Sequence, residues 1–186
     1  MRIESARRAG ARGLTGLLVA ALCGCGQSMP DTSLATADAF VDAFYSWDRA
    51  RLAALVLPGT DADAVLYYQA WAEAAHYQVE HRLPCRELPE GTVVCAITVT
   101  DDFGLALGYT ATDTFTLTVV DDRVATVTFE GDDPPIFQAV FRWLAETRPE
   151  VFDGPCRDLF AGGQTPGDCA RAVAQGARDY AARLAE

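Results

Sequence analysis

The chain has 186 residues, half of them hydrophobic, which is enough for one ordinary domain with a buried core. Its formal net charge is −11, and every basic residue is an arginine. Residues 1–24 carry four arginines and one glutamate, a net charge of +3, which leaves −14 for the rest of the chain. A surface so rich in carboxylates repels phosphate backbones, so we expect no nucleic-acid partner.

The first 24 residues predict an export signal. An arginine-rich start precedes an apolar run over residues 13–22, which is too short to span a bilayer of about 30 Å as a helix. Leu22-Cys23-Gly24-Cys25 then fits the lipobox of bacterial lipoproteins. We predict a signal peptide over 1–24, lipid (diacylglycerol and palmitate) on Cys25, and a tether over 25–33. The domain would then be extracytoplasmic and anchored to the bacterial cell membrane. A plain secretory signal or an uncleaved anchor is the alternative.

Besides the lipidated Cys25, four cysteines would remain after cleavage, in a compartment where disulfides persist. Residues 88–92 (LPEGT) are typical of a three-residue hairpin loop with Gly in the left-handed position. That register places Cys85 directly opposite Cys95, within disulfide reach. Cys156 and Cys169 would then form the second pair. The cysteine and histidine spacings match no metal site, and no cofactor motif is present, so we expect neither metal nor cofactor.

Helical spacing predicts three opening helices. Thr36 is suited to cap the first helix, which would carry Phe40, Phe44 and Trp47 on one face. A short second helix would begin near Asp48 and stop before Pro58-Gly59. Residues 60–63 resemble a capping box for a third helix that runs to about residue 75.

From residue 77 the period changes to two. Segments 77–85, 92–100, 110–120 and 125–129 alternate between apolar and polar residues, which predicts strands. The hairpin register puts the apolar residues of the first two segments on the same face. Residues 101–109 show no clear pattern. Two more helices are expected, over 136–147 and from about residue 168. This order predicts an α+β fold, an antiparallel sheet of four or more strands with helices on one side.

The chain resembles the nuclear transport factor 2-like superfamily, which includes ketosteroid-isomerase-like and polyketide-cyclase-like proteins. The resemblance rests on AFVDAFYSWDRARLAALV, the alternating strands from Tyr77 to Phe129, and PIFQAVFRWLAETRPEVF. It covers about residues 34–152 and implies a cone-shaped curved antiparallel sheet wrapped around the N-terminal helices, with an interior pocket. Residues 153–186 would add a disulfide loop and a helix packed on the same domain.

Enzymes of this superfamily place ionisable groups on the inner face of the sheet. Alternation puts three polar residues there: Tyr77, His81 and Asp113. An Asp against apolar walls would have a raised pKa and could accept a proton next to a carbonyl, while a Tyr or a neutral His could stabilise the oxyanion. The catalytic arrangement of the ketosteroid isomerases is not recognisable by spacing, so no family assignment is carried over.

Two functional hypotheses follow. The first is a non-catalytic domain that binds a small apolar molecule or a partner protein, with Tyr68 and Trp71 as candidate lining residues. Aromatic residues at helical spacing are, however, more often core. The second is an acid–base enzyme (isomerase, dehydratase or cyclase) that uses Asp113 with His81 or Tyr77. A homodimer formed through an exposed sheet face is a further expectation.

Overall fold

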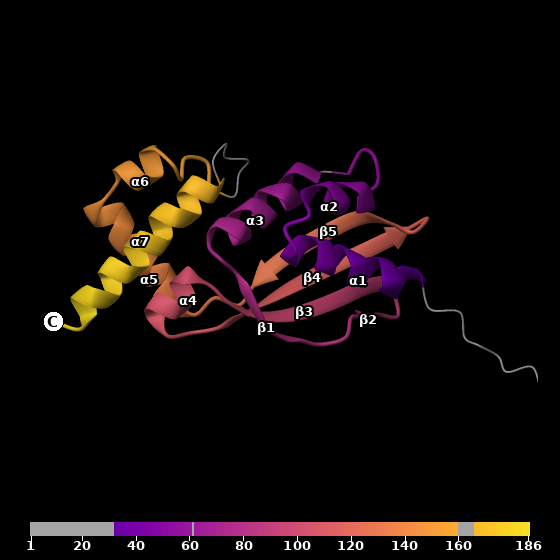
Figure 1. Ribbon diagram of the computed structural model, residues 1–186, viewed down its shortest axis with the longest axis horizontal. Helices are drawn as coiled ribbons and strands as arrows, with labels where there is room; N and C mark the ends of the chain where they lie inside the picture. Colours follow the sequence, from indigo (N-terminus) through magenta and orange to yellow (C-terminus); the bar gives the residue numbers. More distant parts are fainter. Residues whose placement is uncertain (1–31, 61, 160–165) are drawn as a thin grey trace, which may run out of the picture.

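The computed structural model describes residues 32–60, 62–159 and 166–186. The predicted signal peptide, the predicted lipidation site Cys25 and the start of the predicted tether lie outside these residues. The α+β fold is confirmed. Three N-terminal helices cover one face of a five-stranded antiparallel open sheet, and four further helices gather beyond one end of it (Figure 1).

The opening helices are α1 (Thr32–Tyr45), α2 (Arg49–Leu55) and α3 (Ala62–Ala74). The predicted stripe of α1 is buried at Phe40 and Phe44, but Thr36 lies within the helix and does not cap it. Asp48 caps α2, since its side chain accepts a hydrogen bond of 2.9 Å from the Arg51 amide. The predicted capping box of α3 includes Asp61, which is outside the described residues, and the Thr60 hydroxyl donates elsewhere, to the carbonyl of Ala125.

The sheet has the order β1-β3-β4-β5, with β2 also paired to β3. The strands are β1 (Gln78–Arg82), β2 (Arg86–Glu87), β3 (Thr92–Thr100), β4 (Ala111–Val120) and β5 (Arg123–Gly131). Arg86 pairs with Val94, which is the register predicted from the hairpin loop. The same register brings the Cα atoms of Cys85 and Cys95 to 4.3 Å, and the predicted disulfide between them is confirmed.

β1 departs from the predicted alternation. Its pairing with β3 shifts between Val79 and His81, which leaves one extra residue on β1. Beyond the shift, Arg82 pairs with the buried Ile97, while His81 pairs with Thr98 on the opposite face. The prediction that His81 lies on the inner face is therefore wrong. Leu83, expected inside as well, is 53% exposed.

Residues 101–109, which show no pattern in the sequence, contain the short helix α4 (Asp102–Leu107). Asp101 is its cap, because the Asp101 carboxylate accepts a hydrogen bond of 2.6 Å from the Gly104 amide. The helix ends at Gly108, which adopts a left-handed conformation with φ 76°. Fewer than two helical turns give too little periodicity for a sequence to reveal.

A two-residue turn joins β4 and β5. Asp121 and Asp122 both have positive φ, 49° and 57°, as tight hairpins of this kind require. The register shifts just after Thr118, so that Val124 is the buried residue at the start of β5.

The segment that follows α2 covers the start of the edge strand β5. Val56 forms an isolated parallel bridge with Val124, and the Leu57 amide donates a hydrogen bond of 2.9 Å to the Val124 carbonyl. Backbone groups that an edge strand would otherwise leave open are thus paired within the chain.

The C-terminal helices are α5 (Pro135–Thr147), α6 (Glu150–Asp153) and α7 (Pro166–Leu184). α7 packs on α3, α4 and α5, and together they bury a second hydrophobic cluster that includes Leu144 and Val173. The second predicted disulfide, between Cys156 and Cys169, is confirmed and holds the segment after α6 against α7. Leu184, at the end of α7, is 57% exposed.

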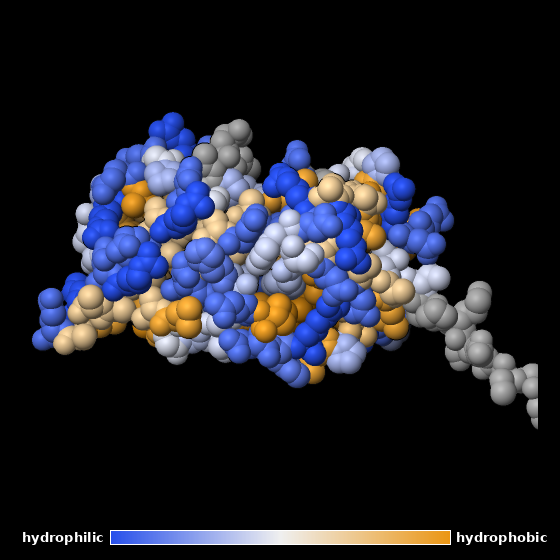
Figure 2. Space-filling model, in the orientation of Figure 1, coloured by the Kyte–Doolittle hydropathy of each residue, from blue (hydrophilic) through white to orange (hydrophobic). Residues whose placement is uncertain are grey.

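Hydrophilic side chains dominate the surface shown in Figure 2, with apolar residues scattered between them. Within the described ranges, no helix has both the length and the apolar character needed to cross a bilayer. The two disulfides indicate an oxidising, extracytoplasmic environment.

Candidate functional site

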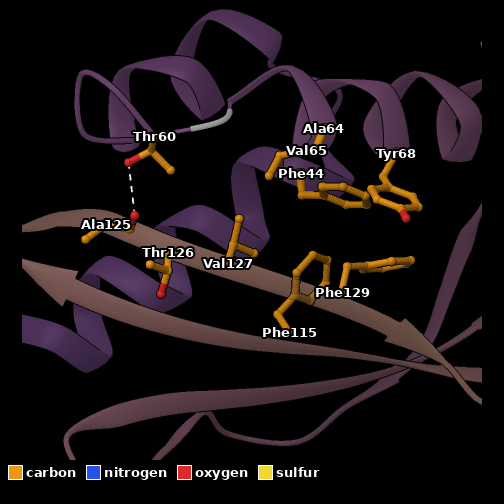
Figure 3. Close-up of a pocket in the computed structure, with 10 residues that line it drawn as sticks. All are labelled: Phe44, Thr60, Ala64, Val65, Tyr68, Phe115, Ala125, Thr126, Val127 and Phe129. Carbon is orange, nitrogen blue, oxygen red and sulfur yellow. Dashed lines mark hydrogen bonds between the residues drawn. The ribbon is translucent and has the colours of Figure 1, made fainter. Parts of the chain in front are cut away.

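Two adjoining cavities lie between α3 and the inner face of the sheet. The first has a volume of about 340 Å³. At one end of it the rings of Phe44, Phe115, Phe129 and Tyr68 gather, and at the other the Thr60 hydroxyl bonds to β5 (Figure 3). The remaining lining residues are Ala64, Val65, Ala125, Thr126 and Val127. The lining is uncharged throughout, so this cavity suits an apolar group.

The second cavity has a volume of about 260 Å³ and shares Tyr68 and Phe129 with the first. The centroids of these two rings are 4.9 Å apart, and both rings belong to both cavities. The second cavity is further lined by Trp71, Ala72, Tyr77, Asp113, Gly131, Asp133, Phe137 and Gln138. Each cavity alone is near the lower limit for small-molecule sites, about 300 Å³, and the pair exceeds it.

The second cavity lies where the two hydrophobic clusters of the protein meet. Phe129 and Tyr68 pack on the cluster between the sheet and α1, whereas Trp71 and Phe137 belong to the cluster around α7. Tyr77 packs against both clusters. The cavity thus lies at a boundary between two packed units, a common position for ligand sites.

Asp113 is the buried carboxyl group of this cavity, with only 3% of its surface exposed. The Tyr45 hydroxyl donates a hydrogen bond of 2.6 Å to Asp113 Oδ2. Desolvation by burial raises the pKa of Asp113 to about 7, and the hydrogen bond from Tyr45 opposes this rise. Near neutral pH both the protonated and the ionised form of this carboxyl group are therefore populated.

Asp133 brings a second carboxylate to the same place. A Cβ atom on Gly131 would lie 3.2 Å from Asp133 Oδ2 and 3.7 Å from Asp113 Oδ1. Both carboxyl groups therefore converge on the small volume that the missing side chain of Gly131 leaves open. Burial, followed by the neighbouring charge of Asp132, raises the pKa of Asp133.

Tyrosines surround these carboxyl groups. Burial, followed by the charges of Asp113 and Asp101, raises the pKa of Tyr77 well above its ordinary value. Burial likewise raises the pKa of Asp101 to about 7 and the pKa of Tyr109. The Tyr109 hydroxyl is buried, and its interaction with the Asp133 carboxylate adds to the rise that burial causes in the pKa of Tyr109 and opposes the rise in the pKa of Asp133. The tyrosines are thus hydroxyl donors and not anions.

Of the candidate site residues predicted from the sequence, the structure brings four together at the second cavity: Tyr68, Trp71, Tyr77 and Asp113. Asp113 is buried on the inner face, as the alternation predicted, and pairs with Gly131. His81 is exposed on the other face of the sheet and cannot act with them. The acid–base hypothesis therefore loses its histidine and keeps Asp113 and Tyr77.

Sequence reasoning missed Tyr45 and Asp133. Tyr45 is the last residue of α1 and follows Phe44, so it lies beside the apolar stripe and not on it. Asp133 follows the end of β5, where an acidic residue usually indicates a solvated turn. The signal that could have found Asp133 is the glycine that faces Asp113 across the β4–β5 ladder, because it leaves room for both carboxyl groups.

No protein-family model matches the chain, and no curated protein matches its sequence. Inferences about function therefore depend on the geometry of the two cavities. No group of three or more potential metal ligands occurs in the described part of the chain. What the cavities offer is an uncharged compartment beside an aromatic compartment with two carboxyl groups.

Proposed function

We propose that this chain is a lipid-tethered extracytoplasmic protein whose nuclear transport factor 2-like domain binds a small, largely apolar molecule. The observation that carries the proposal is the pair of adjoining cavities over the inner face of the sheet, which share Tyr68 and Phe129. Apolar side chains that line a groove open to solvent expose surface that an apolar ligand would remove from water, which favours such an occupant. The apolar body of the ligand would occupy the first cavity, and its polar end would face Asp113.

A fluorescence titration tests ligand binding. The neutral probe N-phenyl-1-naphthylamine gains emission when it leaves water for an apolar site, so a saturable increase is expected with the folded domain. Ala64 of α3 lines the first cavity, and Ala64→Trp should fill it and weaken probe binding at least tenfold. Ala35→Trp, on the exposed side of α1, is the matched control and should leave probe binding unchanged. Equal binding by both variants would refute the proposed site.

Membrane attachment is tested separately. In a bacterial host, globomycin should cause an unprocessed precursor to accumulate, and Cys25→Ala should prevent lipid labelling. A Cys25→Ala protein that is still cleaved normally and still bound to membranes would contradict the anchor.

Acid–base catalysis is the second candidate, because a buried carboxyl group with a pKa of about 7 shares a cavity with the Tyr77 ring. In this mechanism Asp113 would remove a proton next to a ligand carbonyl, and the Tyr77 hydroxyl would stabilise the resulting enolate. Exchange of deuterium from solvent into a cyclic enone, followed by NMR, tests this mechanism. Wild-type exchange no faster than that of Asp113→Asn would exclude it.

A further inference from the structure

The second cavity combines two features that together define a class of ligand. Five aromatic rings line it, those of Tyr68, Trp71, Tyr77, Phe129 and Phe137. Two carboxyl groups, Asp113 and Asp133, line it as well, and no described lining residue is basic. Aromatic faces carry negative partial charge and attract cations, most strongly where water is excluded. Both the aromatic walls and the carboxylates therefore favour a positively charged ligand.

We propose that the second cavity holds an alkylammonium group, a protonated or quaternary amine, whose apolar substituent extends into the first cavity. This proposal rests on the proposed binding function and names the class of its ligand. An anionic ligand would face two carboxylates without a compensating cation. A neutral ligand would leave the negative charge on Asp113 Oδ1, the oxygen that Tyr45 does not bond, without a counter-charge.

The position of the carboxyl groups supports a ligand contact and not a purely structural role. Asp113 is almost fully buried, and its one hydrogen bond within the described residues engages Oδ2. Oδ1 points toward Gly131, next to Asp133 Oδ2, and has no hydrogen bond in the described parts of the chain. Arg82, whose charge acts on Tyr45, is engaged by Asp38 and Asp42 of α1. A cationic ligand would supply the missing counter-charge.

The two cavities also explain why the ligand would be amphipathic. The first cavity has an uncharged lining and the second an acidic one, and the tilted rings of Tyr68 and Phe129 contribute to both. When a cationic head group is bound at Asp113, the apolar chain of the ligand can thus extend into the first cavity, on the same side of the sheet. The site would prefer an amine with an alkyl or aryl chain over a small inorganic cation.

Displacement of N-phenyl-1-naphthylamine tests this assignment with three probes of matched chain length: octyltrimethylammonium, 1-octanol and octanoate. At pH 8, where Asp113 is mostly ionised, octyltrimethylammonium should displace the dye at a concentration at least tenfold lower than 1-octanol, and octanoate should be the weakest. In the double variant Asp113→Asn/Asp133→Asn the advantage of the cation over 1-octanol should disappear. Asp121→Asn/Asp122→Asn, at the remote β4–β5 turn, is the control for net charge and should keep it.

A second variant tests whether the ligand occupies the space between the two carboxyl groups. Gly131→Ala adds a methyl group between the two carboxyl groups and should weaken octyltrimethylammonium more than 1-octanol. Equal displacement by the cation and the alcohol in wild type, or a cation advantage that survives Asp113→Asn/Asp133→Asn, would overturn the alkylammonium assignment and leave the binding function intact. Failure of the dye itself to bind would instead overturn the proposed function.

Discussion

The hydroxyl of Tyr45 donates a hydrogen bond of 2.6 Å to Asp113 Oδ2, and so joins the end of α1 to the inner face of β4 across 68 positions of the chain. The contact holds one oxygen of the carboxyl group and leaves the other directed toward Gly131. Tyr45 thereby fixes the orientation of the acid in the second cavity. Burial raises the pKa of Asp113, and this hydrogen bond should keep the pKa below the value that burial alone would give.

Tyr45→Phe should raise the pKa of Asp113 further above about 7, because the lost hydrogen bond favours the anion. It should also lower the free energy of unfolding by about 1–3 kcal/mol, since a buried acceptor loses its donor. A ¹³C NMR titration of the carboxyl group measures the pKa. Tyr180→Phe, on α7 far from the cavities, is the control. An unchanged or lower pKa in Tyr45→Phe would contradict the assigned role.

Stability should decrease as pH rises toward neutrality, and Asp113 should account for part of that decrease. Its pKa is about 7 in the folded protein and about 3.8 in the unfolded chain, so between these values the folded state binds more protons. The contribution is therefore fully present below about pH 4 and is lost as pH rises to about 7. Its upper limit is about 4 kcal/mol, from roughly 1.4 kcal/mol per pKa unit.

Asp113→Asn should remove this part of the pH dependence. Urea unfolding at pH 4.5, 6 and 8 should show the variant gaining stability relative to wild type as pH increases. Asp121→Asn, in an exposed turn, should follow the wild-type profile. A constant difference between wild type and Asp113→Asn at all three pH values would show that the folded-state pKa of Asp113 is not raised.

Gly176→Ala should destabilise the protein, although alanine favours helices over glycine by about 1 kcal/mol. A Cβ atom at Gly176 of α7 would lie 2.7 Å from both methyl carbons of Leu144 on α5. We expect a loss of about 1–3 kcal/mol in the free energy of unfolding, as for other overpacked cores. Adding Leu144→Ala should relieve the clash, so the double variant should lose less than the sum of the single losses. Additive losses would mean that the two residues do not touch.

Removing either disulfide should cost about 3 kcal/mol, because each closes a short loop and restricts the unfolded chain. The paired variants Cys85→Ala/Cys95→Ala and Cys156→Ala/Cys169→Ala should each unfold at lower urea concentration than wild type. Dithiothreitol should destabilise each variant by less than it destabilises wild type, since one bond is already absent. A variant as stable as oxidised wild type would show that its bond is not formed.

Local rules predicted much of the fold. The loop over 88–92 specified its own register, and this register located a disulfide ten residues apart and the inward face of β3. The alternation over residues 110–120 placed Asp113 on the inner face, where it is buried. These features depend on periodicity and turn chemistry, which are determined by residues close together in the sequence.

Features that depend on one inserted residue or on distant contacts were not predictable. The alternating residues 77–85 give no sign of the bulge in β1, which reverses the faces that His81 and Arg82 occupy. Arg82, expected outside, therefore meets Asp38 and Asp42 of α1. Tyr45 reaches Asp113 only once α1 is packed across the sheet, and no local pattern encodes that pairing.

The short backbone pairing of residues 56–57 with Val124 hinders association between copies of this protein through the edge strand β5. A strand with open amides at the border of a sheet can join the sheet of another molecule, and such joining leads to aggregates. Here the chain occupies that border at the beginning of β5 with its own backbone. If the connection between α2 and α3 loosened, the unpaired backbone groups of β5 would be exposed. Resistance to aggregation therefore depends partly on a segment outside the sheet.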